Sequence, residues 1–289
     1  MTDNFRGALW MTLAMIGFGI EDALFKAATA QGASAGVATV QFGLVAMLLY
    51  ALYACQQGVT VWTREYLKKG LLIRTAFEIM GRLFFALSLA YTPLSTTSAI
   101  LQAAPLVVML GAAVVLGEHI GPRRWAAMAV GFVGVLLIIR PTPEAFQANA
   151  ILAVLGMIGF AGRDLATRTA PLHVHAAQLG VLGFAVVTFA GCVIMLFEGG
   201  PAHLPNPTAA LLLCATAVIG TIGYTAITQA MRTGEVAVVA PFRYTRLLVA
   251  LVLAYWLFDE RPDALTLCGA ALIVASGIYS LLRERRAKT

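Results

Sequence analysis

Charged residues are scarce in this sequence. Only 12% of its 289 residues are Asp, Glu, Lys or Arg, whereas 60% are hydrophobic. Soluble domains carry about 25% charged residues, which help to form a polar surface. This chain lacks the residues to build such a surface, so we predict an integral membrane protein. Its length fits one membrane domain with short connections and leaves no room for a separate soluble domain.

Motifs of catalysis and metal binding are also missing. The sequence has no P-loop, GxSxG or HExxH motif, so we expect no enzyme, no ATP-driven pump and no cofactor. The four cysteines fall inside apolar stretches and form no CxxC pair, which argues against a disulfide framework and a zinc site. His173 and His175 have a metal-like spacing, but we expect a loop without carboxylate or cysteine partners and predict no metal site.

Long apolar runs are abundant. A spanning helix needs about 20 mainly apolar residues. The runs predict ten spanning helices, at residues 8–27, 35–57, 71–90, 95–116, 125–140, 149–168, 175–197, 208–230, 236–258 and 264–282. The first run has a polar start and no small-residue cleavage site behind it, so we expect it to stay attached as a helix.

The basic residues predict the orientation of these helices. If the N-terminus is cytoplasmic, twelve basic residues fall in cytoplasmic segments and three in outer ones, as the positive-inside rule expects. The cytoplasmic set is Arg6, Arg64, Lys68, Lys69, Arg123, Arg124, Arg168, Arg232, Arg283, Arg285, Arg286 and Lys288, and the outer set is Lys26, Arg140 and Arg261. We therefore expect a multi-pass protein of the cytoplasmic (inner) membrane with both termini in the cytoplasm. The net charge of +6 then belongs to the loops and implies no nucleic-acid partner.

The two halves of the chain repeat each other at an offset of 142 residues. Residues 13–18 (LAMIGF) recur as residues 155–160 (LGMIGF). Four further pairs fall at the same offset: Asp22 and Asp164, Lys26 and Arg168, Gly81 and Gly223, and Glu118 and Glu260. Each half holds five predicted spans, an odd number, so the second copy must enter the membrane inverted. We predict an all-α membrane fold of two inverted five-helix repeats, residues 1–141 and 142–289, which permits alternating access to a midplane site.

Several short motifs carry a family resemblance over nearly the whole chain. They are residues 90–99 (AYTPLSTTSA), Pro105, residues 116–118 (LGE) and 131–134 (GFVG) in the first half, and residues 230–235 (AMRTGE), 240–246 (APFRYTR), 258–263 (FDERPD) and 269–273 (GAALI) in the second. The chain resembles the EamA-type permeases of the drug/metabolite transporter superfamily. The resemblance implies a ten-helix bundle whose central cavity is lined mainly by helices 3, 4, 8 and 9. It also implies transport of amino acids, nucleotide-like metabolites or drugs.

Three charges follow one face of the third predicted helix, because Arg74, Glu78 and Arg82 are spaced four residues apart. A charge at mid-bilayer costs about 2.5–3.5 kcal/mol on insertion scales, so such groups usually face a polar cavity or a partner. We predict that Glu78 and Arg82 bind substrate. The alternative is a buried ion-pair ladder that fixes this helix to its neighbours. Arg74 is close enough to the cytoplasmic end to extend its side chain toward water.

The ninth predicted helix carries Arg243, Tyr244 and Arg246 after Pro241. Proline removes a backbone donor, and interrupted helices commonly form transporter sites. Arginine offers a planar fork that suits carboxylate or phosphate. We therefore predict substrate contact by these three residues. The alternative for the two arginines is pairing with Glu78 or Glu235.

The matching carboxylates Asp22 and Asp164 are candidates for ion coupling. A carboxylate in a partly dry site holds a proton more readily than one in water, so it could carry a coupling proton. The alternative is that they pair with Lys26 and Arg168, one turn further along their own helices.

Uncharged polar side chains and a surplus of arginine complete the predicted site. Gln102, Tyr224 and Gln229 lie within spans, and we predict that they bind substrate. The predicted spans hold the cations Arg74, Arg82, Arg163, Arg243 and Arg246 and the anions Glu21, Asp22, Glu78 and Asp164. Excess positive charge favours a zwitterionic or anionic metabolite over a lipophilic cation.

These observations predict a secondary transporter that moves amino acids or amino-acid-derived metabolites, with export favoured by the resemblance alone. Two alternatives stay open: efflux of drugs or toxic metabolites, and uptake of a nucleoside-like metabolite such as S-adenosylmethionine. The expected partners are a small-molecule substrate and the lipid bilayer, in a monomer or homodimer. Coupling to protons, exchange of two substrates and facilitated movement stay open as modes of transport.

Overall fold

The structure is a computed structural model that describes residues 2–91, 100–140, 150–171, 173–198, 204–258 and 263–287. Within these ranges every regular element is a helix, as the apolar runs predict. The helices are α1 (Asp3–Ala30), α2 (Ala35–Gln56), η1 (Arg64–Leu67), α3 (Lys69–Tyr91), α5 (Ala104–Val115), α6 (Pro122–Ile139), α7 (Ala150–Arg168), α8 (Ala176–Glu198), α9 (Pro207–Thr233), α10 (Val236–Val239), η3 (Ala240–Tyr244), α11 (Thr245–Phe258) and α12 (Ala264–Ala287).

Seven helical stretches in the described ranges are long and apolar enough to cross a membrane. They are α1, α2, α6, α7, α8, α9 and the continuous run Val236–Leu253. Helix α5 and the apolar part of α12, Ala264–Tyr279, are shorter. In α3, every 18-residue stretch contains Arg74, Glu78 and Arg82, too much charge for an ordinary lipid-facing span. Each of the ten predicted spans overlaps at least one helix, although residues 95–99 of the fourth span lie outside the described residues. The number of crossings stays a prediction.

The predicted ninth span is not one uniform helix. A 3₁₀ segment, η3, separates α10 from α11 and begins at Ala240, with Pro241 in its first turn. Proline lacks a backbone N–H and so cannot make the regular α-helical hydrogen bond at this point. The change in helix geometry sets the directions of Arg243 and Tyr244, which lie within η3.

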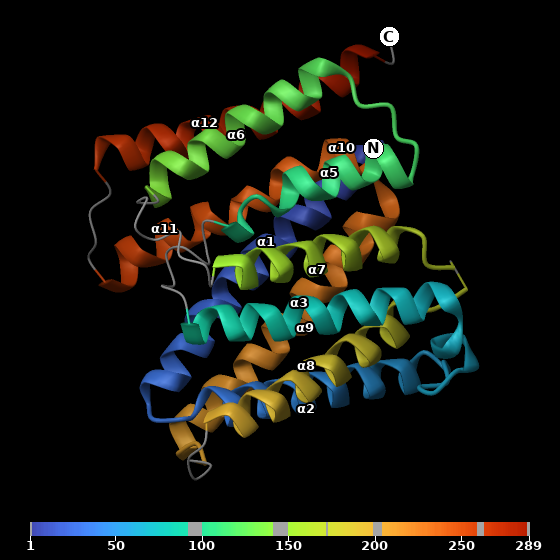
Figure 1. Cartoon of the computed structure of the whole chain (residues 1–289), viewed down its shortest axis with the longest axis vertical. Coiled ribbons are helices and arrows are strands. Elements are labelled where there is room, and N and C mark those ends of the chain that lie inside the picture. The colour runs from blue at the N-terminus through green and yellow to red at the C-terminus, as the bar shows by residue number, and fades with distance from the viewer. Residues whose placement is uncertain are drawn as a thin grey trace.

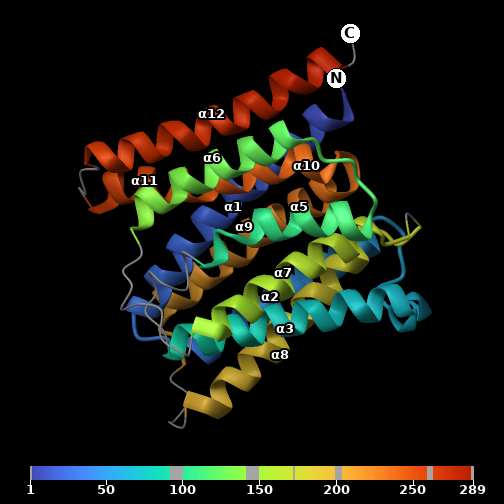
Figure 2. The same ribbon diagram turned by 45° about the horizontal axis from the view of Figure 1, so that its top comes forward.

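The helices pack mainly across the two halves of the chain (Figures 1 and 2). The largest contacts join α1 to α9, α3 to α7, α2 to α8 and α6 to α12. At an offset of 142 residues, α1 corresponds to α7 and α3 corresponds to α9. The α1–α9 and α7–α3 contacts are therefore the same contact made twice. Both termini lie at the same end of the bundle in both views.

Glycine makes both of these repeated contacts close. Gly17 of α1 faces Gly223 of α9, and at the repeat offset Gly159 of α7 faces Gly81 of α3. A Cβ added to Gly159 would lie 2.3 Å from the Gly81 backbone nitrogen, whereas one added to Gly17 would lie 3.2 Å from the Gly223 Cα. Small residues let membrane helices approach to backbone contact. The α3–α7 contact is the tighter of the two.

This difference predicts unequal effects of the same substitution in the two repeats. Gly159→Ala should lower stability by about 1–3 kcal/mol, because a clash with backbone is relieved only by moving a helix. Gly17→Ala should cost less, since a shift of a few tenths of an ångström suffices. The matched control is Gly70→Ala at the start of α3, where an added Cβ meets no atom within 4 Å. Thermal unfolding in detergent measures all three, and equal midpoints for Gly159→Ala and Gly70→Ala would contradict the packing described.

Candidate functional site

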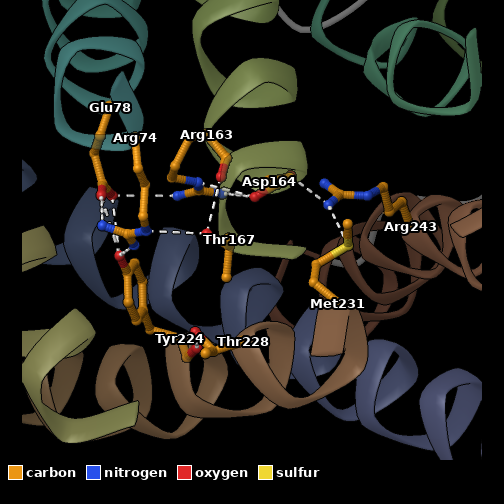
Figure 3. Close-up of polar contacts among 9 residues, drawn as sticks. All are labelled: Arg74, Glu78, Arg163, Asp164, Thr167, Tyr224, Thr228, Met231 and Arg243. Atoms are coloured by element: carbon orange, nitrogen blue, oxygen red, sulfur yellow. Dashed lines mark hydrogen bonds and ion pairs between the residues drawn. The ribbon is translucent and has the colours of Figure 1, made fainter. Parts of the chain in front are cut away.

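Charged side chains from separate helices meet inside the bundle and form one connected polar network (Figure 3). Its members are Arg74 and Glu78 of α3, Arg163, Asp164 and Thr167 of α7, Tyr224 of α9, and Arg243 of η3. Helix packing explains the meeting, because α7 lies against both α3 and α9. Placing an ionisable side chain within a membrane segment costs free energy, and such side chains usually have a function. We therefore take this network as the candidate functional site.

The carboxylate of Glu78 lies between two guanidinium groups. Its side chain is 0% exposed. Arg74 Nη1 lies 3.1 Å from Glu78 Oε2, and Arg163 Nη1 lies 3.4 Å from Oε1. The Tyr224 hydroxyl donates to Glu78 Oε2 at 3.1 Å. Glu78 thus pairs along its own helix with Arg74, and α7 supplies a second cation, Arg163.

Arg74 is buried as deeply as its partner, at 1% exposure. Its Nε donates to Thr167 Oγ1 at 3.0 Å, and its Nη2 donates to the Tyr224 hydroxyl. The expectation that Arg74 extends toward water at the helix end is therefore wrong. Partners on α3, α7 and α9 hold its guanidinium inside the bundle.

The carboxylate of Asp164 joins the network to η3. Arg163 Nε and Nη2 lie 2.9 and 2.7 Å from Asp164 Oδ1, and Arg243 Nη2 donates to Oδ2. The alternative pairing of Asp164 with Arg168 is wrong, because Arg168 turns away and its Nη1 donates to the Met231 carbonyl at 3.1 Å. The network holds three arginines and two carboxylates, so its formal charge is +1.

The matching carboxylate of the first repeat forms a second pair. Arg246 of α11 donates from Nε and Nη2 to the two oxygens of Asp22, at 2.7 and 2.6 Å. The guanidinium also lies over the Phe18 ring, 5.7 Å from its centroid. The partner of Asp22 therefore comes from another helix, not from one turn along α1.

Asp164 and Asp22 thus pair with Arg243 and Arg246, which are three residues apart in the chain. The alternative that these arginines pair with Glu78 or Glu235 is wrong. Neither Arg243 nor Arg246 pairs with Glu78 or Glu235. Glu78 is occupied by α3 and α7, and Glu235 lies 2.8 Å from Arg124 Nη1 and accepts from Asn4.

A small cavity lies beside the network. It is lined by Arg74, Arg163, Asp164, Thr167, Tyr224, Ile227, Thr228 and Met231. Its free volume is about 10 Å³, which is about enough for one water molecule. The side chains therefore close tightly around this point, and a metabolite can enter only if the helices or side chains rearrange.

Among the described residues, the other predicted site residues form no hydrogen bond or ion pair with the network. Arg82 stacks over the Phe160 ring, with its Cζ 5.6 Å from the ring centroid. Tyr244 is buried in an apolar cluster with α6 and α12, and its hydroxyl donates to Met128 Sδ at 3.5 Å. Gln102 lies in the turn before α5 and Gln229 lies on α9, both partly buried. Their roles in substrate binding stay predictions.

Sequence reasoning missed three members of the network: Arg74, Arg163 and Thr167. Arg163 was visible as a charge beside Asp164 in an apolar run, and Arg74 as the first member of the charged face of α3. Thr167 gave no signal, because threonine is common in membrane helices for ordinary packing.

The loop histidine has a partner that the sequence did not predict. His173 Nε2 lies 2.9 Å from Glu65 Oε2, because η1 folds against the loop between α7 and α8. Lys68 lies 2.6 Å from the same carboxylate, and hydrogen bonds from Lys68 and His173 hold the pKa of Glu65 below its ordinary value. In the part of the chain that the structure describes, no three His, Cys, Asp or Glu side chains gather as metal ligands.

Comparison with curated proteins shows similarity to transporters along nearly the whole chain. A riboflavin transporter of Rhizobium johnstonii is 28% identical over 97% of this chain and 92% of its own length. An S-adenosylmethionine uptake transporter of Rickettsia bellii is 24% identical over 97% and 95%. The pseudopaline exporter CntI of Pseudomonas aeruginosa is 27% identical over 94% of each chain.

A solved crystal structure shares the fold, with a TM-score of 0.82, 18% sequence identity and coverage of 98% of this chain and 99% of the other. The family model for EamA-like transporters matches twice, at residues 5–140 and 147–282. Both boundaries differ by 142 residues, the offset of the internal repeat. The protein is a multi-pass membrane transporter with two repeats, and it belongs to the EamA-like transporter family.

Proposed function

We propose that this protein is a secondary transporter of amino acids or amino-acid-derived metabolites and works by alternating access across the bacterial cytoplasmic membrane. The observation that carries the proposal is the buried network with three arginines and two carboxylates. A site with one extra positive charge attracts a carboxylate and repels a lipophilic cation. The planar guanidinium of Arg243, at the edge of this network, can hold a carboxylate with two hydrogen bonds.

The repeated packing supports alternating access. Because the α1–α9 and α7–α3 contacts are equivalent, exchanging the roles of the two halves would give a second state with the same types of contact. In inverted repeats, that second state opens to the opposite side of the membrane. We infer ten crossings in two inverted repeats. Termini at the same end of the bundle agree with an even number, and the positive-inside bias places them in the cytoplasm.

The two aspartate–arginine pairs suggest how a proton could be exchanged for substrate. In the structure, Asp164 holds Arg243 and Asp22 holds Arg246. A substrate carboxylate that binds one arginine competes with its aspartate. The displaced aspartate then lacks a partner and binds a proton more readily. Substrate binding and protonation would thus favour each other on the same side of the membrane.

A second candidate is uptake of a nucleoside-like metabolite. The Rickettsia bellii relative named for S-adenosylmethionine favours it, because that compound carries an amino-acid head group together with a nucleoside. Efflux of drugs is disfavoured by the positive network. The matched relatives are named for uptake and for export, and export is the direction we propose.

Proteoliposomes test the proposal. The purified chain should give saturable flux of at least one member of a panel of the 20 protein amino acids, S-adenosylmethionine and riboflavin, with little flux of tetraphenylphosphonium. Loading one side at a time measures the direction. If tetraphenylphosphonium is transported and every amino acid and S-adenosylmethionine fails, the proposal is wrong.

The coupling step predicts a specific pH response. Asp164→Asn and Asp22→Asn should each weaken the dependence of flux on an imposed pH gradient, because an amide cannot exchange a proton. The matched control is Glu65→Gln, which lies in the exposed η1 loop and should leave the dependence unchanged. An unaltered pH response in both aspartate variants would remove them from the coupling role.

A further inference from the structure

Glu118 is a partly buried carboxylate of the first repeat that binds the backbone of the second. It follows the end of α5, where Gly117 turns the chain with a φ of 68°, and its own N–H donates to the Ala112 carbonyl at 3.1 Å. Its Oε1 accepts from Val236 N at 3.2 Å, and its Oε2 accepts from Ala237 N at 3.3 Å. Glu118 ends the LGE motif, to which the proposed function gives no role.

These two bonds complete the hydrogen bonding at the start of α10. The first N–H groups of a helix have no acceptor within the helix. In α10 the first two N–H groups are those that Glu118 binds, and the next two donate to the Glu235 carbonyl at 3.0 and 3.1 Å. The N–H of Glu235 donates in turn to Asn4 Oδ1 at 2.6 Å. Two side chains of the first repeat therefore tie α10 to α1 and to the end of α5.

Arg243 lies on the segment that Glu118 ties down. The 3₁₀ segment η3, which carries Arg243, follows α10 without an intervening loop. Each residue from 236 to 240 is 1% exposed, and Ala237 packs in one apolar cluster with Tyr244, the residue after Arg243. Because closely packed interiors transmit displacements, a shift at the start of α10 should move the guanidinium of Arg243 relative to Asp164.

We propose that Glu118 is a positioning residue for substrate binding, which holds α10 in the place that sets Arg243 beside the substrate carboxylate. Glu118 itself does not contact the substrate. This inference rests on the proposed function, in which Arg243 binds that carboxylate. Loss of Glu118 should therefore weaken recognition of the carboxylate in particular. A residue that only capped α10 would stabilise the fold and leave that recognition unchanged.

The experiment compares a substrate with and without its carboxylate. The probes are L-methionine and L-methioninamide, in which an uncharged amide replaces the carboxylate. If another amino acid of the panel is the better substrate, that amino acid and its amide replace them. In proteoliposomes at low substrate concentration, the wild type should transport the free amino acid at least tenfold better than the amide. Glu118→Ala should lower this ratio of the two fluxes at least fivefold.

Three further variants separate positioning from ordinary capping. Asn206 caps α9, where its Oδ1 accepts from Ala209 N at 2.8 Å, so Asn206→Ala should lower thermal stability and leave the flux ratio unchanged. In an Arg243→Gln background, Glu118→Ala should change the ratio less than twofold, because no guanidinium is left to position. Glu118→Gln keeps one acceptor oxygen and should give a ratio between those of the wild type and Glu118→Ala. It keeps the test available if the alanine variant does not fold.

Failure of the inference is distinguishable from failure of the proposed function. If the wild type prefers the free amino acid and the Glu118 variants keep its ratio, the positioning role is wrong while the transport function stands. An equal fall of the ratio in the wild-type and Arg243→Gln backgrounds would also overturn it, because the effect would not act through Arg243. If the wild type transports no amino acid or amino-acid derivative, both proposals fail.

Discussion

Replacing Glu78 with alanine is expected to destabilise the protein more than any other single substitution in the network. The side chain is 0% exposed and balances the guanidinium groups of Arg74 and Arg163. Its removal leaves the Tyr224 hydroxyl without this acceptor and reduces the compensation of two buried cations. Breaking a buried ion pair by removing one partner costs about 3–5 kcal/mol. Denaturant or thermal unfolding in detergent measures the loss.

The double variant makes this prediction specific. Arg74→Met combined with Glu78→Leu removes both members of one buried pair and replaces them with apolar groups of similar size. Because buried pairs can be replaced by apolar residues at little cost, the double variant should be more stable than Glu78→Ala. Glu65→Gln, whose carboxylate pairs with Lys68 in an exposed loop, should change stability little. Wild-type stability of Glu78→Ala would show that the carboxylate does not hold the network together.

Replacing Arg243 with glutamine is expected to reduce transport more than tenfold while the protein stays folded. Arg243 lies at the edge of the network, where its Nη2 contacts Asp164 and Met231 Sδ. Asp164 keeps Arg163 as a partner in the variant, so the fold should lose less than it does at Glu78. The site loses the cation that we assign to the substrate carboxylate, and the network becomes neutral. Flux at low substrate concentration gives the effect on transport.

Two further variants separate charge from geometry. Arg243→Lys keeps the charge and loses the planar fork, so flux should fall between those of the wild type and Arg243→Gln. Arg246→Gln removes the equivalent partner of Asp22 in a more exposed pair, where the arginine is 41% exposed, and should affect stability less than Arg243→Gln. Full flux in Arg243→Gln would contradict a substrate role for this residue.

Much of the fold follows from the sequence, because the apolar runs and the 142-residue repeat report directly on helix positions and duplication. The partners of the charged residues were harder to predict. Spacing along one helix suggested Asp164 with Arg168 and Asp22 with Lys26, but the structure pairs these aspartates with Arg243 and Arg246. Contacts between distant helices depend on how the halves pack, which spacing within one helix does not reveal.

The repeat also explains why the site could be predicted only in part. The glycines and phenylalanines that set the packing recur: Gly17 matches Gly159, and Phe18 matches Phe160. The charges are preserved only in part: Asp22 matches Asp164, but Glu21 matches Arg163 and Arg82 matches Tyr224. Duplication therefore preserved the scaffold and one aspartate in each half, while other polar groups of the site changed, so one half predicts the chemistry of the other only in part.

The most direct test of the account is whether the small cavity beside the network becomes accessible from both sides of the membrane. Met231 lines this cavity and is 2% exposed. Cys55, Cys192, Cys214 and Cys268 are replaced with alanine, Met231→Cys is introduced, and a membrane-impermeant thiol reagent is applied to one face at a time. Glu65→Cys in the η1 loop is the control and should react from one face only. The account predicts that the cysteine at position 231 reacts from either face, and reaction from one face only, or from neither, would contradict it.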